Sequence, residues 1–372
     1  MRVGIEAQRI FRHNPHGMDR FAIELIQALC QEEAITSVVV FVNATDIREG
    51  VLPNHSKLNV VVRKGTYVFW EQWILPRLVQ KYTLDILHFT SNTASRFISI
   101  PSIITVHDII YLNKHPLLAK GYSSYQLFGN WYRRLIVNFL LSSNRAIVTV
   151  SRSESKRIEA YSGRDQVPYV YNGVGHGFLN IEDSKVDVFL SKRGISKPYI
   201  LFLGNTDPKK NTPRIIKSFV DVAKSKKDLN FVIADLDRST FCAILGKDAP
   251  ELLHKTTFLG FVDQSALAYL YNGASVFVYC SLAESFGIPI LESFACGTPV
   301  LTSNIPSLKE VSDGGAMPVD PTNQDEISSA IIALLEDSEM RKDCIRKGHL
   351  IANKYSWAKA GSEYLKIYKT VC

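Results

Sequence analysis

The chain has 372 residues, of which 46% are hydrophobic and 21% charged, so it is long enough for two domains and too apolar to be disordered. Its net charge is +7, and the whole excess lies in residues 1–180, which hold 20 Lys and Arg against 13 Asp and Glu. Nucleic acid, anionic lipid, a phosphorylated substrate or ordinary surface charge would each account for this asymmetry.

Targeting segments and cysteine patterns restrict the class further. Glu6 interrupts the first apolar run, so we expect no signal peptide, and no apolar stretch approaches the roughly 20 residues of a spanning helix. The six cysteines contain no C-x-x-C pair, which argues against a zinc site or a disulfide framework. We therefore expect a cytoplasmic protein. The basic first half leaves peripheral contact with the inner face of a membrane open.

The first half of the chain alternates apolar strand patterns with helical patterns. The predicted strands are continuous apolar runs at 2–6, 37–42, 58–62, 85–89, 102–107 and 146–151. Continuous apolar strands joined by helices are typical of a parallel sheet covered on both faces.

A second series of the same kind follows a polar, irregular stretch at 183–197, which we interpret as a linker. Its strands are predicted at 198–204, 230–235, 256–261, 275–280 and 298–303, with helices at 266–274 and 326–337. The sequence therefore predicts an α/β protein with two doubly wound, Rossmann-like domains and an interdomain cleft, at the carboxyl ends of the strands, as the expected ligand site.

The segment from Glu284 to Val300, ESFGIPILESFACGTPV, carries the most specific pattern. Pro289 is tolerated in the first turn of a helix, so a helix is predicted to begin near Gly287. The backbone N–H groups of Phe286, Gly287 and Ile288 would then face an anion or polar oxygens. Glu284 just before the helix and Glu292 within it bracket this N–H-rich pocket, which suits a ligand rich in hydroxyl groups.

This string resembles the signature of the retaining glycosyltransferases of family 4, which have the GT-B fold. That signature is a Glu, seven residues and a second Glu, usually within E-G-F-G-x-P-x-x-E, and Ser285 stands here where glycine is usual. PYILFLGNTDPKKN, FLGFVDQSALAYLYNGASVFVYCSLAESFG, SIITVHDIIY, VTVSRSESKRI and VYNGV are similar to further parts of that family. The resemblance covers nearly the whole chain.

The resemblance implies a division of the chain. An acceptor-side domain is expected at 1–182, the linker at 183–197 and a nucleotide-sugar-binding domain at 198–354. The last segment, 355–372, resembles the helix that returns to the first domain in that family.

It also implies roles for residues of the second domain. Glu284 would hold hydroxyls of the donor sugar together with the backbone at Phe286, Gly287 and Ile288, and Glu292 would hold the ribose hydroxyls. Lys210 matches the lysine that neutralises the donor diphosphate, whereas the neighbouring Lys209 is interpreted as a solvated loop charge. Many relatives have an arginine where this chain has Asn205, so the diphosphate would need another basic partner here.

In the first domain the expected site residues follow two strands. Gly17 would let the backbone approach a phosphate at a helix start, although a simple turn glycine remains an alternative. Arg12 and Arg20 would add charge nearby. His107 matches the family's histidine at the end of a strand and is expected to contact the donor sugar. Asp108 would orient His107 or contact the acceptor.

Two other features have alternative interpretations. Asp235 and Asp237 form a D-x-D after a strand, the pattern with which glycosyltransferases of the other common fold hold a divalent ion. We favour a polar loop and expect no metal. A helical stripe of Phe128, Trp131, Leu135 and Phe139, with Arg133 and Arg134 beside it, is interpreted either as a buried inter-helix face or as a face toward an acceptor or a membrane.

The resemblance implies a retaining, metal-independent glycosyltransferase that uses a nucleotide-sugar donor and front-face displacement. We expect a hexose, with mannose from GDP-mannose as the first choice and UDP- and ADP-sugars open. The expected acceptor is a glycan or lipid-linked saccharide in cell-surface polysaccharide synthesis, and no nucleic acid partner is expected. A nucleotide-sugar epimerase of the same fold and a two-domain binding protein remain alternatives, whereas a glycan phosphorylase would need a longer chain and a pyridoxal lysine.

Overall fold

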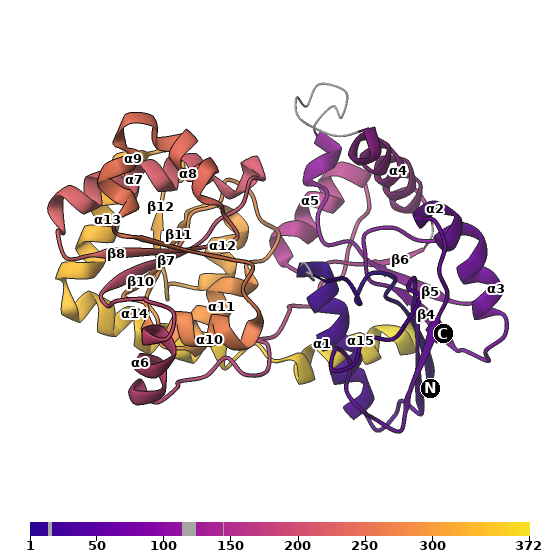
Figure 1. Cartoon of the computed structure of the whole chain (residues 1–372). Coiled ribbons are helices and arrows are strands. Elements are labelled where there is room, and N and C mark those ends of the chain that lie inside the picture. The colour runs from indigo at the N-terminus through magenta and orange to yellow at the C-terminus, as the bar shows by residue number, and fades with distance from the viewer. Residues whose placement is uncertain (14–16, 114–123, 144) are drawn as a thin grey trace. The chain divides into compact units, whose positions relative to one another are not determined.

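The computed structural model describes residues 1–13, 17–113, 124–143 and 145–372. The chain forms two compact units, with Met1–Gly173 and Trp357–Cys372 in unit 1 and Val174–Ser356 in unit 2. In each unit, helices cover both faces of a central sheet (Figure 1).

Unit 1 is built on a six-stranded sheet of order β3-β2-β1-β4-β5-β6, and all its strand pairs are parallel. Its strands are β1 (Arg2–Glu6), β2 (Ser37–Val42), β3 (Leu58–Val62), β4 (Ile86–Phe89), β5 (Ser102–Thr105) and β6 (Ala146–Val148). Its helices are α1 (Gly17–Gln31), α2 (Tyr67–Phe69), η1 (Trp70–Ile74), α3 (Leu75–Val79), η2 (Ile110–Asn113), α4 (Ser124–Leu141), α5 (Arg152–Ser162) and α15 (Trp357–Val371).

Unit 2 repeats this strand order as β12-β11-β10-β7-β8-β9, again with parallel pairs. Its strands are β7 (Tyr199–Leu203), β8 (Asn230–Ala234), β9 (Thr256–Gly260), β10 (Val276–Tyr279), β11 (Val300–Ser303) and β12 (Met317–Val319). Its helices are α6 (Asp183–Ser191), η4 (Pro208–Lys210), α7 (Thr212–Ser225), α8 (Arg238–Leu245), η5 (Gly246–Asp248), α9 (Ala249–Leu253), α10 (Gln264–Gly273), α11 (Ile288–Ala295), α12 (Pro306–Ser312), α13 (Gln324–Glu336) and α14 (Ser338–Ala352).

The strand order reverses direction at one place in each sheet, between β1 and β4 in unit 1 and between β7 and β10 in unit 2. Loops that follow two such strands leave the sheet in opposite directions, which opens a crevice at the carboxyl ends of the strands. Both units are therefore doubly wound α/β structures, as the sequence predicts, and each has one topological switch point.

The last helix, α15, belongs to unit 1. Its Tyr364 and Tyr368 are buried, and their hydroxyls lie 2.9 Å from Thr105 Oγ1 and 2.7 Å from His88 Nδ1. A Cβ on Gly361 would stand 3.0 Å from the Cβ of Ala28, so this glycine lets α15 approach α1 closely. Apolar packing and two buried hydrogen bonds thus fasten the chain end to the first sheet.

The boundary between the units differs from the expected linker at 183–197. Unit 2 begins at Val174, and residues 183–191 form α6. Val186 and Leu190 are buried one turn apart, and Phe189 stacks on Tyr269 of α10 with ring centroids 4.5 Å apart. Packing against α10 thus stabilises a helix at residues 183–191, where the polar composition of the sequence had indicated a linker.

The aromatic stripe of α4 also differs from one of its two interpretations. Trp131, Leu135 and Phe139 are exposed, whereas Tyr132, Ile136, Val137 and Leu140 of the same helix are buried. The buried inter-helix interpretation is therefore wrong for these three residues, and the side chain of Phe128 lies outside the described residues. Among the described residues, no helix combines the length and apolar character needed to cross a bilayer.

Candidate functional site

The switch point of unit 2 brings together two loops that lie far apart in the sequence. β7 pairs with β10, with Phe202 opposite Val278. The loop after β7 carries Lys210, and the loop after β10 carries Glu284, so both leave the same edge of the sheet. The candidate site is the set of side chains that these two loops place next to each other.

Local hydrogen bonds fix the loop that carries Lys210. The Asp207 side chain caps η4 by accepting from the backbone N–H of Lys209 at 3.0 Å. Asn211 adopts a left-handed conformation, with φ of 59°, and its buried amide donates to the carbonyls of Cys280 and Pro321 at 3.0 and 2.7 Å. The Leu282 N–H donates to the Lys209 carbonyl at 2.7 Å, which joins the two loops directly.

Lys210 and Glu284 form an ion pair, with Lys210 Nζ 2.6 Å from Glu284 Oε1. Lys210 Nζ also donates to the Tyr279 hydroxyl at 3.1 Å and lies 5.0 Å from the centre of that ring. Lys209 is placed differently, because its Nζ lies 4.0 Å from Asp207 instead. Of the two neighbouring lysines, Lys210 is the one that faces Glu284.

Each member of the pair stabilises the charge of the other. Burial alone lowers the pKa of Lys210, but Tyr279 and the Glu284 carboxylate outweigh burial and hold that pKa above its usual value. Burial raises the pKa of Glu284, and Lys210 more than cancels this, so the carboxyl pKa is lowered. Both groups are therefore charged at neutral pH. Because the pair is partly buried, the electrostatic interaction of each charge with a ligand is stronger than it would be in water.

The helix that follows Glu284 begins where the sequence predicts. Gly287 is the N-cap of α11, with φ of 114°, and contributes no capping side chain. A Cβ at Gly287 would stand 2.8 Å from Leu308 Cδ2, so both its backbone conformation and the close packing require glycine. Phe286 is buried and its ring lies edge-on to Tyr355 at 6.0 Å, which fixes the backbone just before the helix. Ile288 is the first helical residue.

Glu292 lies deeper than the other predicted donor contacts. It is buried in α11, and the Tyr271 hydroxyl donates to its Oε2 at 3.4 Å. The structure thus brings Lys210 and Glu284 together and places Glu292 in the layer between α10 and α11.

A cavity of about 610 Å³ opens beside the loop between β7 and α7. Asn205, Asp207, Arg214 and Lys217 are among its lining residues. Asn205 is exposed, and its Oδ1 accepts from the Asp207 N–H at 2.8 Å, so its amide shapes the loop. Two cations on α7 therefore lie on the side of the loop where Asn205 replaces the family's arginine.

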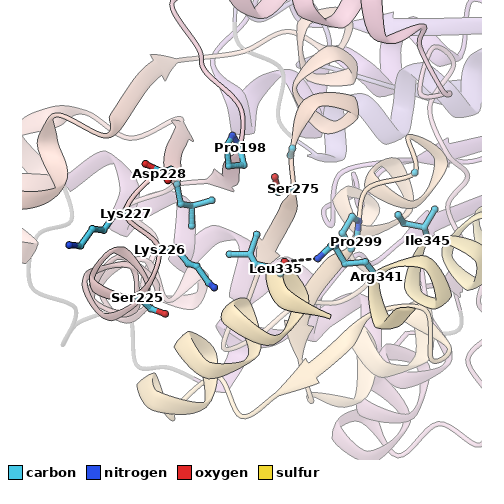
Figure 2. A pocket seen from close by; sticks show the side chains of 13 residues that line it. Pro198, Ser225, Lys226, Lys227, Asp228, Ser275, Pro299, Leu335, Arg341 and Ile345 are labelled. Atoms are coloured by element: carbon cyan, nitrogen blue, oxygen red, sulfur yellow. Dashed lines mark hydrogen bonds between the residues drawn. The ribbon is translucent and has the colours of Figure 1, made fainter. Parts of the chain in front are cut away.

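A second cavity, of about 620 Å³, lies at the opposite edge of this sheet (Figure 2). Its lining includes Pro198, Ser275 and Pro299, which directly precede β7, β10 and β11. Arg341 in this cavity donates to the carbonyl of Leu335 at 2.6 Å and so caps the end of α13. Since ligands of doubly wound sheets bind at the carboxyl ends of the strands, we do not assign the donor site to this cavity.

The D-x-D segment is built as a turn and a helix cap. Asp235 has a φ of 57°, and Asp237 is the N-cap of α8. The Asp237 carboxylate accepts from the N–H and hydroxyl of Thr240, both at 2.8 Å, and from the Ser239 hydroxyl at 2.5 Å. These hydrogen bonds lower the pKa of Asp237 to about 2. The carboxylate oxygens are therefore engaged in capping, as expected of a polar loop.

Two predicted first-domain residues lie at the carboxyl edge of the unit 1 sheet. His107 is buried, and its Nε2 lies 2.9 Å from the Thr90 carbonyl, which can only accept, so Nε2 carries a proton. Burial, the largest effect, lowers the pKa of His107 to about 4, so the ring is neutral at pH 7 and its Nδ1 is an acceptor. Asp108 beside it is half-buried.

The start of α1 carries the other predicted residues of this unit. Gly17 is exposed, and apart from its own neighbours in the chain and helix, no atom of the described residues stands within 4 Å of where its Cβ would lie. Arg12 lies 3.7 Å from Asp19, and Arg20 is half-buried. Packing against the described protein atoms therefore does not require glycine at position 17.

Sequence reasoning missed three titratable residues in these regions. Tyr279, the second partner of Lys210, ends a buried strand at the switch point, and that position was the available signal. In unit 1, Glu6 and Glu71 are buried carboxyl groups whose pKa values are raised, chiefly by burial. The pKa of Glu71 rises to about 7, and it accepts from Gln72, Thr93 and Tyr132. No motif surrounds Glu71 in the sequence.

Comparisons with known proteins find relatives of similar sequence and solved structures of similar fold. The E. coli O-antigen chain mannosyltransferase B is 25% identical over 95% of this chain and 96% of its own length. The Salmonella typhimurium O-antigen chain mannosyltransferase RfbU is 27% identical over 85% and 86%. Anabaena HepE, solved in complex with UDP-glucose, superposes with a TM-score of 0.77 at 15% identity over the full length of both chains.

Two family models together account for most of the chain. Residues 15–177 match the model described as Glycosyltransferase Family 4, and residues 189–350 match the one described as Glycosyl transferases group 1. All but the last four residues of the first match fall on unit 1, and the second match falls on unit 2. The chain is therefore a glycosyltransferase of the GT-B fold, in which a family 4 domain is joined to a group 1 domain.

Proposed function

We propose that this glycosyltransferase moves a hexose, with mannose as the first choice, from a nucleotide-diphospho-sugar to a saccharide acceptor, with retention of configuration and without a metal ion. The observation that carries the proposal is the Lys210–Glu284 pair, which joins the two loops at the switch point of unit 2. At this edge of the sheet, the Lys210 cation suits the diphosphate of the donor, and the Glu284 carboxylate suits the hydroxyl groups of its sugar.

Lys210 supplies the positive charge for the diphosphate. An ammonium group carries three protons, and Glu284 and Tyr279 accept from two directions, so the third remains for a phosphate oxygen. The raised pKa keeps the side chain charged across the physiological range. Because negative charge grows on the leaving phosphate in the transition state, a fixed cation here lowers the barrier more than it strengthens ground-state binding.

Glu284 and the start of α11 are proposed to hold the sugar. An ionised carboxylate accepts hydrogen bonds from sugar hydroxyls, and these are stronger than bonds to neutral acceptors. The helix begins at Ile288, after the N-cap Gly287, so its first backbone N–H groups and its dipole favour a negative ligand. His107 and Gly17 of unit 1 remain predicted contacts of the donor, and Asp108 remains predicted to orient His107 or to contact the acceptor. Glu292 remains the predicted partner of the ribose.

The proposed reaction is a front-face displacement. The bond between the anomeric carbon and the diphosphate oxygen breaks, and the acceptor oxygen bonds to the same face of that carbon. The acceptor's proton passes to the departing phosphate oxygen, and the nucleoside diphosphate leaves. No protein nucleophile is needed, so the protein acts by positioning the substrates and stabilising charge.

Metal independence is part of the proposal, and two observations support it. Asp237, the acid that would hold an ion, is committed to capping α8. Arg214 and Lys217 line the cavity beside Asn205 and offer positive charge in place of the missing arginine. We propose that these two residues, rather than an ion, share the diphosphate charge with Lys210.

The choice of donor and acceptor rests on relatives. Three of the similar proteins are named as mannosyltransferases, two acting on O-antigen chains and one from Mycobacterium tuberculosis on phosphatidyl-myo-inositol. We therefore propose GDP-mannose as the donor and a glycan or lipid-linked saccharide of the cell surface as the acceptor. UDP-glucose is the main competitor, because HepE was solved with it.

The test is an assay with GDP-mannose, UDP-glucose and an ADP-sugar, in which the products are separated and the anomeric configuration of the new bond is read by NMR. The proposal expects α-linked product from an α-linked donor, in EDTA, and product formation about 10²-fold slower or more with Glu284→Gln. Inversion of configuration would overturn the retaining assignment. Epimerised nucleotide-sugar without transfer would favour the epimerase instead.

A further inference from the structure

An exposed aromatic surface lies on unit 1, away from the residues assigned above. It consists of six large apolar side chains, each between 38% and 58% exposed: Phe69, Trp73, Phe97, Trp131, Leu135 and Phe139. We call these six residues the aromatic surface. Single exposed apolar side chains are common on the surfaces of soluble proteins, but a connected group of this size is typical of an interaction site.

Two helical stripes make up most of this surface. Phe69 and Trp73 lie four residues apart on α2 and η1, and their rings stack with centroids 5.7 Å apart. Trp131, Leu135 and Phe139 follow each other at four-residue steps on α4, so they share one face of that helix.

The loop after β4 connects the two stripes. The Phe97 ring lies 6.0 Å from the Trp73 ring, and the guanidinium of the preceding Arg96 lies 4.2 Å above the ring of Phe139. The six side chains are thus neighbours on one face.

A buried hydrogen-bond network holds the helices beneath this surface. Gln72 of η1 donates to the Tyr132 hydroxyl of α4 at 2.7 Å, and its Oε1 accepts from the Arg96 N–H at 3.0 Å. Glu71 accepts from Tyr132 in the same network. Gln72, Arg96 and Tyr132 directly neighbour Trp73, Phe97 and Trp131 in the sequence, so the network fixes the positions of these three aromatic residues from below.

The sequence around the surface is mostly positive. Residues 69–153 contain nine Lys and Arg against three acids, Glu71, Asp85 and Asp108, and Glu71 is buried. Arg77 and Arg96 are exposed and lie within this group, since Arg77 follows Trp73 by one helical turn and Arg96 contacts Phe139. Tryptophan and phenylalanine with flanking arginines and few acids are typical of a surface that enters the headgroup region of an anionic bilayer.

We propose that the aromatic surface is a membrane-docking face, which binds anionic lipid through Trp73, Phe97, Trp131 and their neighbours. The evidence for this docking face is the exposure of the six side chains and the charge of the sequence around them. Its purpose, to hold unit 1 where a lipid-linked acceptor is found, rests on the proposed function. Each charged residue adjacent to the headgroups contributes attraction that salt screens, so binding will weaken as ionic strength rises.

The distribution of tryptophans gives a direct readout. Of the four in the chain, Trp70 and Trp357 are buried, whereas Trp73 and Trp131 belong to the aromatic surface. Vesicles of phosphatidylcholine with about one-third phosphatidylglycerol should therefore shift the tryptophan emission to the blue, and brominated lipid should quench it. Trp73→Phe and Trp131→Phe should each remove part of the quenching while binding persists.

The decisive variants carry a charge on the exposed face. Trp73→Glu combined with Phe97→Glu should lower vesicle binding about tenfold or more, because two carboxylates enter an anionic interface. The matched control is Phe261→Glu, since Phe261 is 43% exposed on unit 2 and the substitution is the same. Unchanged melting temperatures and unchanged nucleotide binding should accompany both, because these side chains are exposed and outside the donor site.

Two results would overturn the proposal. One is wild-type protein that does not bind these vesicles at low salt, or that binds them equally well after the double substitution. The other is a concentration-dependent dimer that the double substitution dissociates, which would assign the surface to a second copy of the chain. Vesicle binding is measured without donor or acceptor, so its outcome is separate from the outcome of the transfer assay.

Discussion

The two units share one strand order but surround their carboxylates with different groups. In unit 2, Glu284 contacts Lys210, and its pKa is lowered. In unit 1, Glu6 and Glu71 are fully buried among hydroxyl and amide groups, and their pKa values are raised. The same topology thus presents a charged pair in one unit and, in the other, a hydrogen-bond network whose carboxyl groups ionise less readily than in water.

This difference teaches that topology fixes where a site forms, whereas the loops decide its chemistry. A charged pair suits a ligand that is itself charged, such as a diphosphate. A buried network costs free energy when it is ionised, so it is suited to a structural role. In unit 1 that network lies beneath the aromatic surface and joins η1 to α4.

The largest effect is expected from Glu284→Gln. The amide keeps the size of the side chain but loses the charge that faces Lys210 and that we propose accepts sugar hydroxyls, so turnover should fall about 10²-fold or more. Initial rates with saturating donor measure this. Glu251→Gln, an exposed change in the same unit, is the control, and a normal rate in Glu284→Gln would remove Glu284 from the site.

The buried Glu71 network of unit 1 should make the free energy of unfolding depend on pH. The unfolded chain releases the Glu71 proton near the ordinary pKa of 4.5, whereas the folded protein holds it until about pH 7. The stability that this carboxyl contributes is therefore present below pH 4.5 and is lost as pH rises to 7.

Relative to Glu71→Gln, the wild type should lose about 2 kcal/mol of unfolding free energy between pH 5 and pH 7. Urea denaturation at several pH values measures the difference, and Glu49→Gln, an exposed change on the same unit, should track the wild type. Parallel curves for wild type and Glu71→Gln would show that Glu71 is ionised in the folded protein throughout.

A smaller effect is expected from Glu292→Gln. Because Glu292 is buried beside Tyr271, the isosteric amide is a gentler probe than alanine. A ribose contact predicts that KM for the donor rises about tenfold while kcat changes little. A fall in kcat with an unchanged KM would contradict the ribose assignment, and a lowered melting temperature alone would indicate a purely structural role.

The smallest effect is expected at the D-x-D. Asp237→Asn keeps a good N-cap, so turnover and melting temperature should both stay close to wild type. Activity should also survive EDTA. Loss of turnover in EDTA that Mg²⁺ or Mn²⁺ restores, together with loss in Asp237→Asn, would give the acidic pair the role that we assign to Lys210.

The sequence predicted the parts of the fold that depend on local pattern. Apolar runs predicted strands β1 to β11, and the prediction at each is confirmed. Strand β12 was not predicted, because its short apolar run contains Pro318 and ends at Asp320, whereas β6, also three residues long, lies in the longer apolar run at 146–151. The helix α6 was missed because its packing on α10, a contact between distant segments, stabilises it. Long-range packing of this kind leaves little trace in a short polar segment.

The candidate functional residues also fall into those that the sequence predicted and those that depend on contacts between distant segments. Lys210 and Glu284 are 74 residues apart, yet each follows a strand, and the reversal of strand order brings the two strand ends together. Glu71 lies in a polar-aromatic stretch with no motif, and its environment comes from Thr93 and Tyr132 on other elements. Which face of α4 is buried depends on the elements that pack against this helix. The periodicity of the sequence therefore predicted the aromatic stripe but did not predict whether the stripe is exposed.

One measurement tests the central claim, that Lys210 binds the donor diphosphate. It is the melting temperature of wild type, Lys210→Ala and Lys209→Ala with GDP, UDP, ADP and the matching nucleosides. The right nucleotide at about 100 times its Kd should stabilise the wild type and Lys209→Ala by about 2.7 kcal/mol, and Lys210→Ala much less. The nucleoside alone should not distinguish the three proteins. Equal stabilisation of Lys210→Ala and the wild type by the diphosphate would contradict the account.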